Sequence, residues 1–206
     1  MPQITINSLD ELDRYISERN VRLVGLVGAP GSGKSTTSEA LLKYLPGAVV
    51  VPMDGFHYSN EVLERMGLRH LKGTPETFDS QAFADAVKKV CLREKPVSFP
   101  EFDRSIEGSI DDRILVNPEH RVVIIEGNYL LLPTPPWSEL STLLELTVFV
   151  ERDDTLRLAQ LKQRHIQSGK DPDFASEWMN RVDGPNAVLI EGTRARADVI
   201  FHNIGQ

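Results

Sequence analysis

The chain has 206 residues, of which 40% are hydrophobic and 26% are charged, and its formal net charge is −7. These values are typical of a folded globular protein and exclude disordered and fibrous classes. The acidic balance argues against nucleic-acid binding as the main activity, because that affinity comes largely from Lys and Arg side chains that neutralise phosphates. The single cysteine, Cys91, excludes an intramolecular disulfide and a multi-cysteine metal site. We expect it to be a buried or half-buried helix residue.

The first residues lack a basic segment followed by a long apolar one, and no apolar stretch approaches about 18 residues. This pattern predicts neither secretion nor a membrane span, and it favours a cytoplasmic location.

Apolar runs and helical patterns alternate along the chain. Ser8, with Glu11 three residues later, is typical of a capping box that begins a helix extending to about Asn20. The apolar run 22–27 predicts a strand, and a helical pattern follows the glycine-rich residues 28–33 until Pro46. Further strands are predicted at 48–51, 96–99, 122–125, 146–150 and 197–201, and further helices near 80–93, 153–168 and 173–190.

The glycine-rich segment after the first of these apolar strands fits the phosphate-binding pattern G-x-x-x-x-G-K-[ST] and lies between a strand and a helix, as that motif requires. Its backbone N–H groups and the following helix N-terminus are suited to phosphate oxygens. We expect Lys34 to reach the β- and γ-phosphates, Ser35 to bind Mg²⁺ and Thr36 to hold the α-phosphate. The predicted ATP-binding residues are Gly28, Ala29, Pro30, Gly31, Ser32, Gly33, Lys34, Ser35 and Thr36.

Together these patterns predict an α/β fold, with three layers, in which a mainly parallel sheet of the P-loop NTPase type is flanked by helices. Residues 1–206 are expected to form one domain. Residues 52–79 and 94–120 are too long for simple connections, so we interpret them as substrate-facing insertions. The chain lacks the guanine-specifying N-K-x-D of GTPase switches, which leaves a small-molecule or nucleotide kinase.

Two acids follow predicted strands, where ligands of a parallel sheet bind. Asp54 follows strand 48–51 after two residues, and Glu126 follows strand 122–125 directly. We expect Asp54 to act as base for, or to orient, an acceptor hydroxyl, and Glu126 to join the metal shell through water. The alternative is that each acid only forms a turn.

Three basic residues and one histidine are further candidates. Arg104 and His57 are expected to contact the substrate, although Arg104 could instead pair at the surface with neighbouring acids. Arg157 and Arg164 are seven residues apart and share a helix face, so both are candidate transition-state clamps in a lid near 157–172. Ordinary solvated helix arginines are the alternative.

Four motifs resemble those of one kinase family: M-D-G-F at 53–56, K-G-T-P-E-T-F-D at 72–79, I-E-G at 125–127 and A-D-V-I at 197–200. The chain resembles the P-loop kinases that include uridine kinase, phosphoribulokinase and bacterial pantothenate kinase. It is most similar to the bacterial nucleoside/nucleotide kinase-like proteins labelled fructose transport system kinase. The resemblance implies that Asp54 activates the acceptor hydroxyl, that the donor is ATP, and that the chain after 197–200 lies near the adenine.

Two departures from that family bear on the substrate. Uridine kinases carry an aspartate that holds ribose hydroxyls where this chain has Gly73, which argues against uridine as the acceptor. Gln160 and Leu161 occupy lid positions at which uridine kinases carry arginines.

The sequence therefore predicts an ATP- and Mg²⁺-dependent kinase that phosphorylates a hydroxyl of a small molecule, such as a sugar, a sugar derivative or a nucleoside. Its catalytic residues would be Asp54, Lys34 and Arg164. One alternative is a nucleoside-monophosphate-type kinase whose phosphate acceptor binds Arg69, Lys72 and Arg104. Another is a nucleotide-dependent regulatory module, and the oligomeric state, including a homodimer, stays open.

Overall fold

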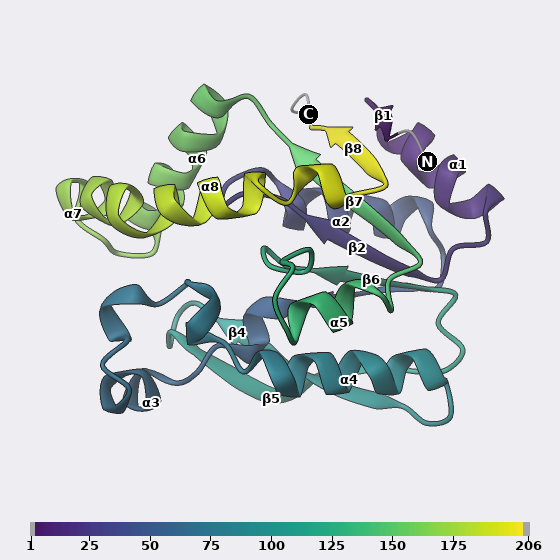
Figure 1. The fold of residues 1–206 in the computed structure, drawn as a ribbon, viewed down its shortest axis with the longest axis horizontal. Coiled ribbons are helices and arrows are strands. Elements are labelled where there is room, and N and C mark those ends of the chain that lie inside the picture. Colours follow the sequence, from purple (N-terminus) through teal and green to yellow (C-terminus); the bar gives the residue numbers. More distant parts are fainter. Residues whose placement is uncertain (1–2, 204–206) are drawn as a thin grey trace.

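The computed structural model describes residues 3–203. Within this part of the chain, six strands form one sheet in the order β1-β8-β7-β2-β6-β3, and every pairing is parallel (Figure 1). In that order the strands are Ile4–Ile6, Val199–His202, Leu146–Glu151, Leu23–Val27, Val122–Glu126 and Ala48–Pro52. β2 and β6 are buried along their whole length, which explains their continuous apolar sequences.

Helices cover both faces of this sheet, and the predicted three-layer fold is confirmed. Alternate residues of β2 point to opposite sides, so Val24 and Leu26 pack with α1 (Leu9–Glu18) and α2 (Lys34–Tyr44). Leu23 and Val27 belong to the core on the other face. That face is covered by α4 (Ser80–Leu92), α5 (Trp137–Ser141) and α8 (Gly184–Glu191).

The predicted helix at 173–190 is wrong as a single element. It consists of α7 (Pro172–Trp178), a π-helical stretch (Met179–Asp183) and α8. Gly184 and Pro185 open α8, and because proline has no N–H to donate, the regular helical ladder is interrupted there. The last strand begins at Val199, two residues later than predicted, and β1 was missed.

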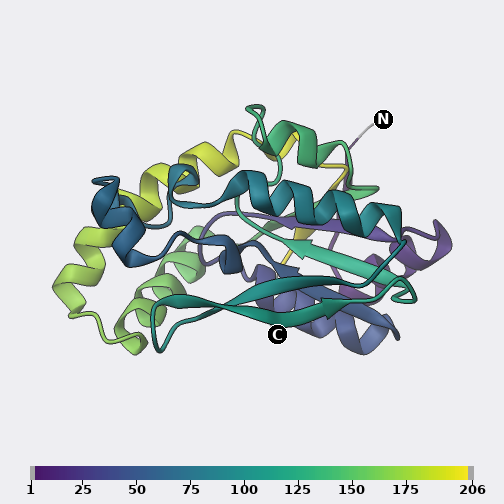
Figure 2. The ribbon, with the colours of Figure 1, turned by 90° about the horizontal axis from the view of Figure 1, so that it is seen from below.

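The insertion 52–79 consists of α3 (Asn60–Arg65) and three single 3₁₀ turns, Met53–Phe56, Arg69–Leu71 and Pro75–Thr77. The insertion 94–120 is an antiparallel hairpin of β4 (Val97–Asp103) and β5 (Gly108–Val116), of which only a short strand at 96–99 was predicted (Figure 2). β5 was missed because it is largely exposed and its sequence is polar. Figure 1 places both insertions with α4 on one side of the molecule and α6 (Asp154–Gln167), α7 and α8 on the other.

Cys91 lies on α4 as expected, but it is exposed, so its predicted burial is wrong. The buried stripe of α4 runs through Phe83, Val87 and Val90, and Cys91 lies beside it. None of the helices in residues 3–203 has the length and apolar content needed to cross a membrane.

Candidate active site

The glycine-rich loop connects β2 to α2 at the carboxyl end of the sheet. Gly31 and Gly33 have φ angles of 83° and 90°, a region that favours glycine. At Gly28 a Cβ atom would lie 2.5 Å from the Val150 carbonyl oxygen, so a side chain has no room there. These three glycines fix the path of the loop, and its shape places the Lys34 and Ser35 side chains at the start of α2.

Lys34 is buried, and its ammonium donates to the carbonyl oxygens of Gly28 at 2.8 Å and Ala29 at 3.3 Å. Burial lowers the pKa of Lys34 to about 8, while the negative charge of Glu126 opposes that shift. A positive charge in so dry a position attracts anions strongly.

The two residues predicted to hold a metal lie in direct contact. Ser35 Oγ donates to Glu126 Oε1 at 2.6 Å, and Ser38 Oγ donates to Oε2 of the same buried carboxylate at 3.0 Å. Ser38 was missed by the sequence reasoning, although its position three residues after Ser35 places it on the same helix face. This group presents oxygen donors, the ligand type that Mg²⁺ prefers.

A cavity of about 980 Å³ opens in front of the loop, lined by residues of β3, α2, α6 and the hairpin. Asp54 and Arg104, which are fifty residues apart in sequence, meet there with 3.7 Å between Arg104 Nη2 and Asp54 Oδ2. Neighbouring acids have other partners: Glu101 pairs with Arg113, and Asp103 accepts from Ser105. The alternative in which Arg104 pairs with those acids is therefore not what the structure shows.

A smaller cavity of about 400 Å³ adjoins the first, and six residues line both of them. We call these six the junction: Pro30, Asp54, Phe102, Arg104, Asn128 and Arg164. Asn128 was missed by the sequence reasoning, although it follows Glu126 at the end of β6 and the strand-end rule that selected Glu126 applies to it as well.

His57, which the sequence analysis proposed as a substrate contact, lines the smaller cavity. Its Nδ1 lies 2.8 Å from the Asp54 carbonyl oxygen, and its ring centroid lies 3.9 Å from that of Phe78. Burial lowers the pKa of His57, while the charge and the carbonyl oxygen of Asp54 oppose that shift.

The two arginines of α6 have different surroundings. Arg157 is buried. Its guanidinium donates from Nη1 to the Pro30 carbonyl oxygen at 3.1 Å and from Nε to the Asp154 carboxylate at 2.8 Å. Its guanidinium holds the glycine-rich loop, and its interpretation as a transition-state clamp does not fit these contacts. Arg164 lines both cavities, and its guanidinium makes no hydrogen bond or ion pair with the residues that the structure describes.

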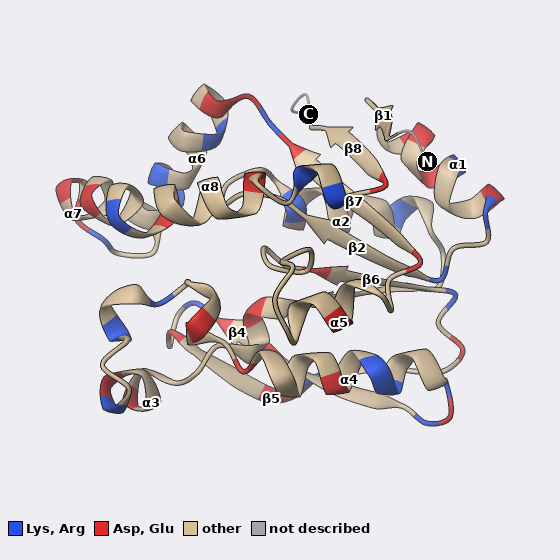
Figure 3. Ribbon diagram, viewed as in Figure 1, with Lys and Arg blue, Asp and Glu red and all other residues tan. Residues whose placement is uncertain are grey.

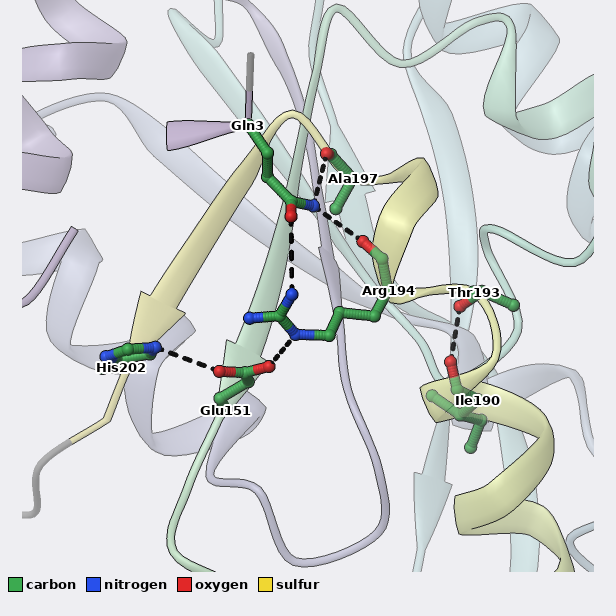
Figure 4. Close-up of polar contacts among 7 residues, drawn as sticks. All are labelled: Gln3, Glu151, Ile190, Thr193, Arg194, Ala197 and His202. Carbon is green, nitrogen blue, oxygen red and sulfur yellow. Dashed lines mark hydrogen bonds and ion pairs between the residues drawn. The ribbon is translucent and has the colours of Figure 1, made fainter. Parts of the chain in front are cut away.

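A third cavity, of about 970 Å³, lies on the other side of the loop and is lined by residues of α6, α8 and the end of β8. Two apolar side chains on its rim, Leu156 and Val188, are 49% and 75% exposed. Glu151 and His202 also line it, and Glu151 accepts from Arg194 and pairs with His202 at 3.0 Å (Figure 4). Gln3 fixes Arg194 in turn by donating to its carbonyl oxygen at 2.8 Å. The end of β8 therefore lies beside a cavity that both apolar and polar side chains line.

The A-D-V-I motif that opens β8 has a structural explanation. Asp198 Oδ2 accepts from the backbone N–H of Thr147 at 2.8 Å and from its hydroxyl at 2.7 Å. These bonds join the start of β8 to β7.

The far wall of the smaller cavity contains a polar chain that the sequence reasoning missed. Lys170 Nζ lies 2.9 Å from His165 Nδ1, and His165 Nε2 lies 2.7 Å from Asp183 Oδ2. No local signal identifies this chain, because Asp183 lies in the π-helical stretch, eighteen residues after His165.

Comparison with known proteins agrees with this geometry. A family model for the phosphoribulokinase / uridine kinase family matches residues 23–206. A candidate uridine kinase from Schizosaccharomyces pombe is 36% identical over an alignment that covers 97% of this chain and 92% of that protein. A pantothenate kinase from Limosilactobacillus fermentum is 30% identical, with 92% of this chain and 71% of that protein covered.

Among solved structures, a candidate fructose transport system kinase from Silicibacter sp. TM1040 is 38% identical, with a TM-score of 0.81. The match covers 94% of this chain and 98% of that one. The family resemblance predicted from the four motifs is confirmed. With its family model, its kinase relatives and its fold in agreement, this ATP-dependent kinase belongs to the phosphoribulokinase / uridine kinase family.

Proposed function

We propose that the chain transfers the γ-phosphoryl group of MgATP to a hydroxyl of a small molecule, with Asp54 as the group that accepts the hydroxyl proton. The observation that carries this proposal is the position of Asp54 at the junction, where it lines both the loop-side cavity and the smaller cavity. A carboxylate between a phosphate loop and a second pocket is suited to a hydroxyl acceptor.

The nucleotide is proposed to bind with its phosphates on residues 28–36 and its base in the cavity between Leu156 and Val188. The apolar side chains of Leu156 and Val188 suit a flat aromatic ring, and the polar groups of Glu151 and His202 suit its nitrogen atoms. An ATP donor fits the cytoplasmic location predicted from the sequence.

The residues present fit a Mg²⁺ ion. Ser35 Oγ and the carboxylate of Glu126 would hold it, because both are hard oxygen donors beside the loop and Ser38 fixes the second carboxylate oxygen. When bound, the ion would neutralise charge on the β- and γ-phosphates.

In the proposed reaction, the acceptor oxygen forms a bond to the γ-phosphorus while its proton passes to the Asp54 carboxylate. The bond from the γ-phosphorus to the bridging oxygen breaks, and ADP keeps that oxygen. Lys34 and Arg164 stabilise the negative charge on the transferred group, since both side chains line the loop-side cavity.

Replacement of Asp54 by Asn tests this proposal. With a panel of sugars, sugar derivatives, nucleosides and hydroxy acids, Asp54→Asn should lower kcat by about 10²-fold or more at unchanged affinity for MgATP. Asp111→Asn, on the exposed surface of β5, is the matched control and should change neither value.

A phosphate acceptor is the second candidate, because Arg69, Lys72 and Arg104 all line the smaller cavity. Such an acceptor has no hydroxyl proton to lose, so Asp54→Asn should then cost little. Full activity of this variant, with nucleoside monophosphates as the best acceptors, would refute the hydroxyl proposal. ATP hydrolysis with every acceptor silent would favour the regulatory module instead.

A further inference from the structure

The smaller cavity is basic although the chain as a whole is acidic. Of the described residues that line it, five are Lys or Arg and three are Asp or Glu, whereas the chain carries a net charge of −7. Positive charge that is concentrated at one cavity of a negatively charged protein indicates that this cavity binds an anion.

The three carboxylates of this cavity already have partners. Glu107 pairs with Arg69 at 3.1 Å, Asp183 with His165 at 2.7 Å, and Asp54 with Arg104 at 3.7 Å. Arg69 and Arg104 therefore pair with two of these carboxylates and a histidine with the third, which leaves Lys72, Lys170 and Arg164 without a carboxylate at ion-pair distance among the described residues.

Lys72 and Lys170 are two of these remaining cations, and their contacts are with neutral groups. Lys72 Nζ donates to the Asn60 side-chain oxygen at 2.7 Å and to the Glu107 backbone oxygen at 2.8 Å. Lys170 Nζ lies 2.9 Å from His165 Nδ1. Within residues 3–203, neither ammonium has a carboxylate at ion-pair distance, and each has three N–H groups to donate.

Both lysines are held in place by aromatic rings. Lys72 Nζ lies 5.1 Å from the centroid of Phe102, and Lys170 Nζ lies 5.2 Å from that of Trp178. Both side chains are half-buried, and this partial burial is the main reason that the pKa of each is lowered. Positioned, partly dehydrated ammonium groups bind an anion more strongly than mobile surface lysines do.

The two lysines come from opposite walls of the cavity. Lys72 belongs to the insertion 52–79, and Lys170 to the turn between α6 and α7, which lie across from each other in Figure 1. Figure 3 shows Lys or Arg segments on both of these walls. The lysines line the smaller cavity alone, whereas Asp54 and Arg164 belong to the junction with the phosphate side. An acceptor whose hydroxyl lies at Asp54 therefore extends toward the lysines.

We infer that the acceptor is itself an anion: a hydroxylated small molecule whose carboxylate or phosphate group lies between Lys72 and Lys170 while its hydroxyl faces Asp54. This inference rests on the proposed function. A volume of about 400 Å³ suits a molecule of the size of a sugar phosphate or a small hydroxy acid. The anion is an anchor and not the reacting group, because these lysines lie outside the junction and the carboxylate of Asp54 would repel a phosphate there.

Matched pairs of compounds that differ in charge test this inference. The protein is first saturated with a non-hydrolysable MgATP analogue, which occupies the glycine-rich loop. It is then mixed with one compound at a time from four pairs, the charged member named first: gluconate and glucitol, ribose 5-phosphate and ribose, uridine 5′-monophosphate and uridine, and pantothenate and pantothenol. Affinity is measured by thermal stabilisation, and phosphotransfer is measured separately with MgATP. The charged member of every pair that binds should bind at least about tenfold more tightly, and the responding pairs distinguish carboxylate from phosphate.

Variants of the two lysines locate the effect. Lys72→Met and Lys170→Met should each weaken binding of the charged compound by about ten- to a hundredfold, the cost of one charged hydrogen bond, with no change for its neutral partner. Lys162→Met, exposed on α6 outside the cavities, is the matched control. Since Lys72 also joins the insertion to the hairpin, Lys170→Met gives the decisive result if Lys72→Met unfolds.

The inference and the proposed function fail in different ways. Equal or tighter binding of the neutral compounds, binding that ignores both lysine changes, or no binding of any charged compound would overturn the inference. Phosphotransfer to a neutral alcohol alone would overturn it and leave the proposed function intact. Charge-selective binding without phosphotransfer would support the anion site and count against the proposed function.

Discussion

Arg157 and Arg164 share a residue type and a helix, yet their contacts predict opposite effects on replacement by methionine. Arg157→Met removes a buried charged hydrogen bond to the Pro30 carbonyl oxygen, worth about 1.5–3 kcal/mol. The pair with Asp154 adds at most about 0.5 kcal/mol, because the Asp154 side chain is 79% exposed. We expect a loss of about 2–3 kcal/mol in unfolding free energy and a Tm lower by about 5–10 °C.

Arg164→Met should leave stability within about 0.5 kcal/mol, because its guanidinium makes no hydrogen bond or ion pair with the described residues. Its charge lies at the junction, where the transferred phosphoryl group would be. Loss of one such charge typically lowers kcat by about 10²–10³-fold. For Arg157→Met, by contrast, the displaced loop should raise KM for ATP more than it lowers kcat.

Urea unfolding followed by circular dichroism gives the free energies, and ADP formation with the best acceptor gives kcat and KM. Each variant is the other's control, because the same side chain is replaced on the same helix. If Arg164→Met lost as much stability as Arg157→Met, its role would be structural. If Arg157→Met unfolded like the unmodified protein, the bond to Pro30 would not hold the loop.

Two further predictions concern stability. Asp198→Ala removes both bonds to Thr147 and leaves the buried Thr147 N–H unpaired, so the unfolding free energy should fall by about 2–4 kcal/mol. Asp111→Ala is the control and should leave that free energy unchanged. A loss below about 0.5 kcal/mol for Asp198→Ala in urea unfolding would contradict this prediction. Because burial lowers the pKa of His57, only the unfolded state takes up its proton as pH falls through about 6.5, and stability decreases there by up to about 1.4 kcal/mol per pH unit. His57→Gln should therefore flatten the pH dependence of the unfolding free energy between pH 7.5 and 5.5. His70→Gln, at an exposed position, is the control. If both variants showed the same slope of unfolding free energy against pH, the dependence could not be assigned to His57.

The sequence was sufficient for the parts of this fold that local patterns determine. The glycine-rich loop needs an apolar strand before it and a helix after it, and both lie within a few residues of it. The position of Asp54 and Glu126 beside the loop-side cavity could be predicted because carboxyl ends of parallel strands meet at one edge of the sheet. β1 has three residues of which one is buried, and β5 is mostly exposed, so neither carries a periodic apolar signal.

The roles of the α6 arginines could not be separated from the sequence. Both lie on one helix face, and the difference between them depends on the Pro30 carbonyl oxygen, which is more than a hundred residues away in the chain. The same limit applies to Lys170, for which the sequence predicts only a position within the lid near 157–172. Its neighbours His165 and Trp178 come together through the turn between α6 and α7, and no spacing rule describes that turn.

Gly73 shows how structure changes the meaning of a substitution. Its φ of 106° lies in a region that non-glycine residues rarely adopt, so an aspartate at this position would be strained in this backbone. Its carbonyl oxygen accepts from Tyr129 and from Asn186, and these bonds hold the insertion against the core and α8. Where uridine kinases carry the aspartate that holds neutral ribose hydroxyls, this cavity has Gly73 and, next to it, Lys72.

The net charge of the chain argues against nucleic acids as partners, but it does not show where the Lys and Arg side chains that bind a small anion lie. A long polyanion would meet the acidic surface of this chain along with any basic patch, whereas a small anion meets only the cavity that admits it. If the acceptor is an anion, two negatively charged substrates must lie within one cleft, and their repulsion has to be offset there. Lys34 and Arg164 on the phosphate side, with Lys72 and Lys170 on the acceptor side, are placed to offset it. The basic acceptor cavity in an acidic protein is then a requirement of the reaction.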